Sequence, residues 1–181
     1  MKTVVLKIAR QAIQDAFDQK NSIEVDQLAK EHPWLNEEGA SFVTLTQNGK
    51  LRGCIGSLIA RCPLIEDIID NANAAAFKDP RFMKLTKKEF EETDIEVSIL
   101  TPPALVDYTD TQDLKNNITP HVDGVILSLD GYQATFLPQV WEELPDFEQF
   151  FGHLLNKAGL PMDSFKNHPT IYKYNVKKFK E

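Results

Sequence analysis

The chain has 181 residues, a formal net charge of −7, 42% hydrophobic and 26% charged residues, and an isoelectric point near 5.1. This balance is typical of a globular protein, and the acidic charge disfavours general binding to a phosphate backbone, which needs a surplus of lysine and arginine. The sequence also lacks an apolar run of bilayer-spanning length, the apolar core of a signal peptide, and enough cysteines for a disulfide framework. We therefore expect a cytoplasmic protein with reduced thiols.

The first 60 residues predict a helix followed by a β-hairpin. Apolar residues recur at helical spacing over residues 5–16, and residues 28–35 predict a short irregular connection, with or without one helical turn. Two strand-like runs, 40–47 and 50–58, flank Asn48-Gly49, which is the strongest short-range signal for a hairpin.

A two-residue hairpin loop fixes the expected register of these two strands. It pairs Gln47 with Lys50, and alternation along the strands then pairs Leu45 with Arg52 and Val43 with Cys54. One face of the hairpin is expected to hold Arg52, Cys54, Gly56, Leu45 and Val43. This register makes burial of Cys54 beside Val43 a serious alternative to an accessible thiol.

The next segments predict two helices and a strand. Pro63 suits the first position of a helix, whose apolar stripe continues until Asp79-Pro80 stops it. Thr86-Lys87-Lys88-Glu89 has the pattern of a capping box at the start of a short helix. The alternation over residues 95–99 predicts a strand.

The second half predicts another hairpin, a helix and a last strand. Residues 122–129 and 132–137 flank Asp130-Gly131, a strong helix runs from Asp146 to Gly159, and residues 171–176 predict the final strand. Hairpins and alternation favour an α+β fold with a mostly antiparallel sheet over a doubly wound α/β fold. We expect one domain, with approximate halves 1–100 and 101–181 that share a core.

The stretch Leu51-Arg52-Gly53-Cys54-Ile55-Gly56 is the candidate site. A thiol near a cation is a better nucleophile or soft ligand, and Arg52 lies two residues from Cys54 on the expected strand face. Gly53 and Gly56 would allow a ligand or another backbone to approach closely. The alternative is that Cys54 is a small buried hydrophobe and that Arg52 pairs with a carboxylate.

A second candidate is the basic segment around Asp79 and Arg81, with Lys78, Lys84, Lys87 and Lys88 nearby. It could form an anion-binding rim for a phosphate, a carboxylate or a short nucleic-acid segment. The alternative is a solvated turn in which Asp79 holds Arg81, and for the lysines this alternative is preferred.

Two further polar residues are candidates for lining the same site. Ser98 lies beside Glu96 on the polar face of its strand, and Gln139 follows Pro138 at a strand end. Both could equally be ordinary strand or strand-end residues. The four histidines are scattered, and the motifs of zinc, dinucleotide, nucleoside-triphosphate and hydrolase sites are absent, so we expect no metal and no cofactor.

With these motifs the sequence resembles a known family, the AMMECR-type domain. The resemblance is to protein A of the AmmeMemoRadiSam three-gene system. The specific match is Leu51 to Gly56. Individually weaker matches follow in the family's order at Asp79-Pro80-Arg81-Phe82, Val97-Ser98-Ile99-Leu100, Asp123-Gly124, Leu137-Pro138-Gln139-Val140 and Lys157-Ala158-Gly159-Leu160.

The resemblance implies an α+β fold of two unequal lobes, with a barrel-like sheet built from two β-rich repeats and a cleft lined by the motif. It also implies two partners, a radical SAM enzyme and a Memo-like protein, in a modification pathway, but it supplies no reaction. We therefore expect an enzyme or enzyme component with a site around Arg52 and Cys54 that takes a small anionic ligand. The alternatives are a non-catalytic scaffold for those partners and, more weakly, a nucleic-acid-binding protein.

Overall fold

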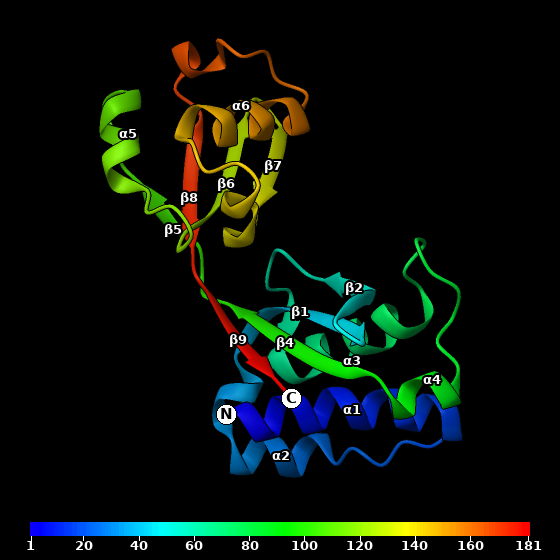
Figure 1. Ribbon diagram of the computed structural model, residues 1–181. Coiled ribbons are helices and arrows are strands. Elements are labelled where there is room, and N and C mark those ends of the chain that lie inside the picture. The colour runs from blue at the N-terminus through cyan, green and yellow to red at the C-terminus, as the bar shows by residue number, and fades with distance from the viewer. The chain divides into compact units, whose positions relative to one another are not determined.

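The computed structural model describes all 181 residues, and the chain divides into two compact units, each described by itself (Figure 1). Unit 1 comprises Met1–Leu100 and Lys177–Glu181, and unit 2 comprises Thr101–Val176. Each unit contains its own cluster of buried hydrophobic residues. The core that the two halves are expected to share stays a prediction.

Unit 1 combines helices with one sheet. Its helices are α1 (Lys2–Asp18), α2 (Val25–Glu31), α3 (Leu64–Phe77) and α4 (Lys87–Glu91), with a 3-10 turn η1 (Pro33–Asn36). Its strands are β1 (Glu38–Gln47), β2 (Lys50–Gly56), β3 (Cys62–Pro63), β4 (Asp94–Leu100) and β9 (Val176–Lys180). The sheet order is β2-β1-β4-β9, and β3 pairs with the beginning of β1, so β2 is an edge strand.

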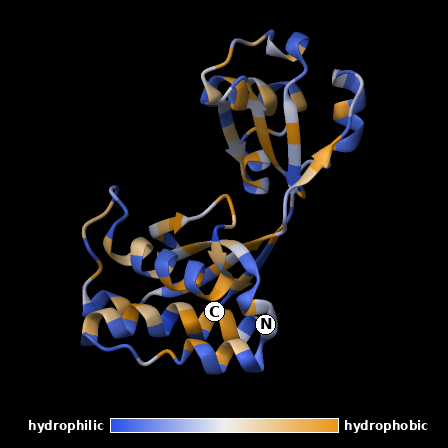
Figure 2. Ribbon diagram, turned by 180° about the vertical axis from the view of Figure 1, so that it is seen from behind, coloured by the Kyte–Doolittle hydropathy of each residue, from blue (hydrophilic) through white to orange (hydrophobic).

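The core of unit 1 lies between this sheet and two helices. Helix α3 packs against β1 and β2 on one side and against α1 on the other. The sheet contributes Val43, Leu45, Ile95 and Val97 to this core, and all four side chains are fully buried. Hydrophobic and hydrophilic residues alternate along α1, as Figure 2 shows, because only one face of the helix meets this core.

Unit 2 contains a four-stranded antiparallel sheet of β5 (Ala104–Val106), β8 (Thr170–Tyr174), β6 (Gly124–Leu129) and β7 (Tyr132–Phe136), in that order. Helices α5 (Thr111–Asn117) and α6 (Phe147–Ala158) and the turns η2 (Pro138–Glu142) and η3 (Ser164–Asn167) complete it. Helix α6 packs on β6 and β7, and Trp141 of η2 stacks on Phe150 of α6 with ring centroids 3.6 Å apart.

The α+β class predicted from the sequence is confirmed. Both Asx-Gly turns have positive φ at both central residues, as a two-residue hairpin requires, and the Thr86–Glu89 capping box is present. Neither sheet closes into a barrel, so the barrel-like detail is not confirmed. The sequence missed α2 as a full helix and β9 in the lysine-rich tail. No helix combines the length and the apolar character needed to cross a membrane.

The predicted hairpin register is wrong beyond its first pairs. Gln47 does pair with Lys50, but a β-bulge leaves Arg52 as an extra residue, so Leu45 pairs with Gly53 and Thr44 with Cys54. A shift of one residue moves every later side chain to the opposite face of the sheet. Cys54 therefore lies on the face opposite α3, which we call the outer face, and not beside Val43.

Candidate functional site

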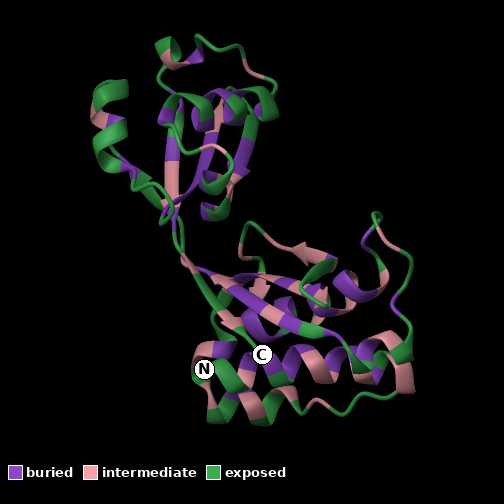
Figure 3. Ribbon diagram, in the orientation of Figure 1, coloured by how far each residue is buried: buried purple, intermediate pink, exposed green.

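Cys54 lies near the middle of edge strand β2 with its side chain on the outer face. The residue is half-buried, like most of β2 (Figure 3). The Cys54 sulfur and the Thr44 hydroxyl are 3.2 Å apart, within hydrogen-bond distance. Thr44 also pairs with Glu96 on β4, so Cys54, Thr44 and Glu96 form one row across three strands. The sequence left open whether Val43, Leu45 and α3 enclose the thiol, and the structure shows that they do not.

Asp79 and Arg81 hold the backbone of Cys54 from the open side of β2. The Cys54 amide donates a hydrogen bond of 2.9 Å to Oδ2 of Asp79, and Nη2 of Arg81 donates one of 3.2 Å to the Cys54 carbonyl. An adjacent strand would supply the same acceptor and donor. We call this pair the Asp79–Arg81 clip, because it occupies the sheet edge at Cys54 where a further strand would otherwise pair.

The clip is held together by an ion pair. Backbone N, Nε and Nη2 of Arg81 donate to the Asp79 carboxylate at 3.1, 3.0 and 2.7 Å. The Asp79 side chain is only 2% exposed, whereas that of Arg81 is 54% exposed. The hydrogen bonds from Arg81 hold the pKa of Asp79 well below its usual range, against the opposing effect of burial. The structure therefore confirms that Asp79 holds Arg81, and it leaves part of the guanidinium open to solvent.

Arg52 is directed at a carboxylate and not at the thiol. Its Nε and Nη2 each donate to Glu89 at 3.2 Å, and its guanidinium lies 5.9 Å from the ring centre of Phe82. The hydrogen bonds from Arg52 lower the pKa of Glu89 to about 2. Because Glu89 also closes the capping box of α4 with Thr86, Arg52 ties the β-bulge to that helix. Pairing of Arg52 with a carboxylate was the alternative predicted from the sequence.

The two glycines of the motif are required by packing. A Cβ on Gly53 would lie 2.2 Å from the backbone oxygen of Ala75 in α3, and one on Gly56 would lie 2.3 Å from the ring of Phe42. Gly53 thus lets another backbone approach, which is one of the two roles the sequence suggested.

The other two candidate residues fall in different units. Ser98 of β4 is 7% exposed and pairs with Phe42, one row along from Thr44 and Glu96. Gln139 belongs to η2 of unit 2, so its part in the site stays a prediction. No group of three or more histidine, cysteine or acidic side chains is placed to hold a metal ion.

The sequence analysis missed a buried polar network beside the motif. Asp67 of α3 accepts hydrogen bonds from the amide and hydroxyl of Ser41, at 2.7 and 2.6 Å, and from Asn71 at 2.9 Å. Asn71 also donates to Ser57, directly after β2. Asp67 and Asn71 stand four residues apart within the apolar stripe of α3, and that spacing was the available signal.

The fold and the site together define an α+β protein whose edge strand carries the Leu-Arg-Gly-Cys-Ile-Gly motif. In this protein the Asp79–Arg81 clip holds the backbone of the motif. The chain belongs to the AMMECR1 family, whose model matches residues 6–179. This confirms the resemblance found in the sequence.

The relatives include archaeal proteins that carry no functional description. A protein from Methanothermobacter thermautotrophicus is 36% identical over 180 residues, covering 98% of this chain and 92% of its own length. One from Sulfolobus acidocaldarius is 38% identical over 181 residues, covering 97% and 77%. The crystal structure of uncharacterized protein PH0010 from Pyrococcus horikoshii superposes with a TM-score of 0.83 at 33% identity, covering 99% of this chain and 91% of that one.

Proposed function

We propose that this AMMECR1-family protein is a cytoplasmic enzyme or enzyme component in which Cys54 is the reactive or ligand-contacting group. Arg81 supplies the cationic group for a small anionic ligand, and Asp79 positions both residues. Arg52, Gly53, Gly56 and Ser98 shape the surroundings of the thiol. The protein acts with a radical SAM enzyme and a Memo-like protein in a modification pathway.

The observation that supports this proposal is that the backbone of Cys54 is held by hydrogen bonds while the residue is only half-buried on the outer face. The amide and carbonyl of Cys54 are both fixed by the clip, while its sulfur lies on the half-buried outer face beside a hydroxyl. The guanidinium of Arg81 reaches the carbonyl of the same residue, and the Arg81 side chain as a whole is still 54% exposed. An anion held by Arg81 would therefore lie next to the thiol.

The test is alkylation of the native protein in a Cys62→Ser background, which leaves Cys54 as the only thiol. We expect iodoacetamide to label Cys54 without unfolding, and phosphate or acetate to slow the labelling. Arg81→Gln is expected to abolish this protection, while Arg61→Gln, a matched change at another exposed arginine, should preserve it. Labelling that requires unfolding, or protection that survives Arg81→Gln, contradicts the proposal.

A second function, a non-catalytic binding module for the same partners, is favoured by one observation. Large apolar side chains are exposed on β2, on the loop after it and on the loop before α4, namely Leu51, Leu58, Ile59 and Met83. A module of this kind needs the motif for its shape and not for its thiol. Co-purification of the radical SAM or Memo-like partner that is lost with Met83→Ser and retained with Cys54→Ala would favour this second function.

A further inference from the structure

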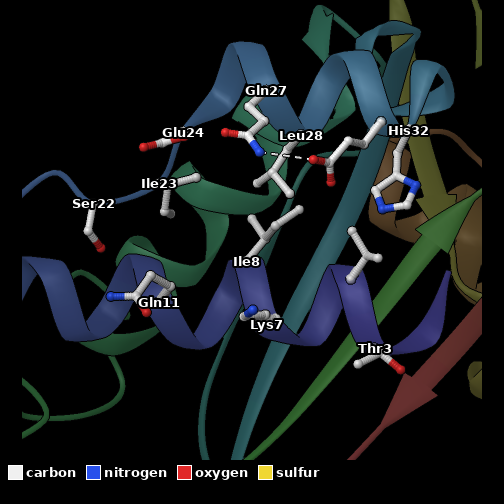
Figure 4. A pocket seen from close by; sticks show the side chains of 12 residues that line it. Thr3, Lys7, Ile8, Gln11, Ser22, Ile23, Glu24, Gln27, Leu28 and His32 are labelled. Atoms are coloured by element: carbon white, nitrogen blue, oxygen red, sulfur yellow. Dashed lines mark hydrogen bonds between the residues drawn. The ribbon is translucent and has the colours of Figure 1, made fainter.

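Unit 1 contains a pocket that none of the motif residues line. It lies between α1 and α2, has a volume of about 480 Å³, and is closed at one end by the segment that joins the two helices. Figure 4 shows Ile8 of α1 and Leu28 of α2 directed at one another across it, with Ile23 beside them. Ligand sites commonly have volumes of about 300 to 1,000 Å³ and mainly apolar walls, and this pocket has both features.

The pocket exists because α2 does not close onto α1. Helix α2 buries only Ala29 and packs against η1, and Leu28 is left half-buried facing the space. An apolar space of this size next to water gains free energy when an apolar group fills it. The polar groups at its end are already satisfied, since Gln11 and Ser22 both donate to Asp15.

The mouth of the pocket has opposite charges on its two walls. Lys7 lines the pocket from α1 (Figure 4), and Glu31 lines it from α2, where Gln27 donates a hydrogen bond of 3.0 Å to the Glu31 carboxylate. Lys7 forms no ion pair, and Glu31 forms none either, although both line the same opening. A cation and an anion above an apolar floor are complementary to a small zwitterion with an apolar side chain.

We propose that this pocket binds a free amino acid with a large apolar side chain. The ligand's ammonium group lies against Glu31, its carboxylate lies against Lys7, and its side chain inserts between Ile8 and Leu28. Charge-assisted hydrogen bonds at the mouth select for the zwitterion, and the apolar walls select for side-chain size. This site is separate from Cys54 and does not depend on the function proposed for it.

Three probes that share one apolar group test the proposal by titration calorimetry on the full chain. Phenylalanine carries both charges, 3-phenylpropanoate carries only the carboxylate, and phenethylamine carries only the ammonium group. We expect saturable binding of phenylalanine and binding about tenfold weaker for each singly charged analogue, because each lacks one charge-assisted contact. Equal affinity for all three probes, tighter binding of either analogue, or no binding of phenylalanine overturns the proposal.

Variants of the pocket test which charged side chain contacts which charged group of the ligand. Lys7→Gln and Glu31→Gln are each expected to weaken phenylalanine binding about tenfold, and Lys7→Gln should leave phenethylamine binding unchanged. Glu24→Gln is the matched control, because it removes an unpaired carboxylate from another part of the rim. Leu28→Phe is expected to fill the space and block binding, with circular dichroism confirming the fold. A loss with Glu24→Gln as large as that with Glu31→Gln overturns the proposed orientation.

Discussion

Replacing Asp79 tests whether the clip holds β2. Asp79→Ala leaves the Cys54 amide without its acceptor, and an unsatisfied backbone donor costs about 1–3 kcal/mol. It also removes the ion pair with Arg81, which adds only about 0–1 kcal/mol because the Arg81 side chain is 54% exposed. We therefore expect a loss of about 1–4 kcal/mol in the free energy of unfolding.

Asp79→Asn separates the acceptor from the charge. The amide oxygen of asparagine can still accept from Cys54, so the expected cost falls to that of the lost ion pair, about 0–1 kcal/mol. Asp70→Ala, at an exposed aspartate of α3 with no hydrogen bond or ion pair, is the matched control and should change stability by less than about 0.5 kcal/mol.

Urea unfolding measures these differences, and a loss of about 3 kcal/mol lowers the midpoint by about 1.5 M for a slope of about 2 kcal/mol/M. Exchange of the Cys54 amide hydrogen adds a local readout, which Asp79→Ala should accelerate and Asp79→Asn largely preserve. If Asp79→Asn proves as destabilising as Asp79→Ala, or if Asp79→Ala costs less than about 0.5 kcal/mol, the Asp79 carboxylate does not hold the backbone of Cys54.

The remaining predictions concern packing, acid stability and the buried network. Gly53→Ala should destabilise the protein by at least about 2 kcal/mol in urea unfolding, because the added Cβ would meet the backbone of α3 at 2.2 Å. Stability should decrease as the pH falls below about 4.3 towards about 2, because Arg52 lowers the pKa of Glu89 to about 2 and protonation of Glu89 removes its contribution to stability. Glu89→Gln should therefore reduce the slope of an acid titration followed by circular dichroism. Asp67→Ala should cost about 3 kcal/mol by calorimetry because it leaves the amide and hydroxyl of Ser41 unsatisfied, whereas Asp67→Asn should cost less.

Local signals in the sequence were sufficient for most of the elements. Asn48-Gly49 and Asp130-Gly131 specify their turns because few other residue pairs adopt two successive positive φ angles, and the capping box at Thr86 closes within four residues. The fold class follows from such elements. Helix α2 was harder to predict because it has only seven residues and fully buries only Ala29. Strand β9 was harder to predict because it is rich in lysine and lies at the edge of the sheet.

The candidate site stays a prediction, but the strand geometry predicted for it from the sequence is wrong. The motif itself indicated Arg52 and Cys54, and the predicted register placed them together on one strand face, with burial of Cys54 beside Val43 left open. The bulge at Arg52 cannot be read from the motif, because it depends on the ion pair between Arg52 and Glu89 and on the approach of α3 to Gly53. One extra residue was enough to move Cys54 from the core face to the outer face.

The bulge and the ion pair with Glu89 accompany a change in which arginine contacts Cys54, from the expected Arg52 to Arg81. With Arg52 occupied by Glu89, the only arginine with a hydrogen bond to Cys54 comes from the turn after α3. That turn begins where Asp79-Pro80 ends the helix, so the proline that stops α3 also delivers a carboxylate and a guanidinium to the edge of β2. The Leu51–Gly56 and Asp79–Phe82 motifs, 25 residues apart at Cys54 and Asp79, are thus two parts of one structural unit. The effect of a substitution in either motif on the backbone of Cys54 should therefore be measured before any effect on chemistry is assigned to that substitution.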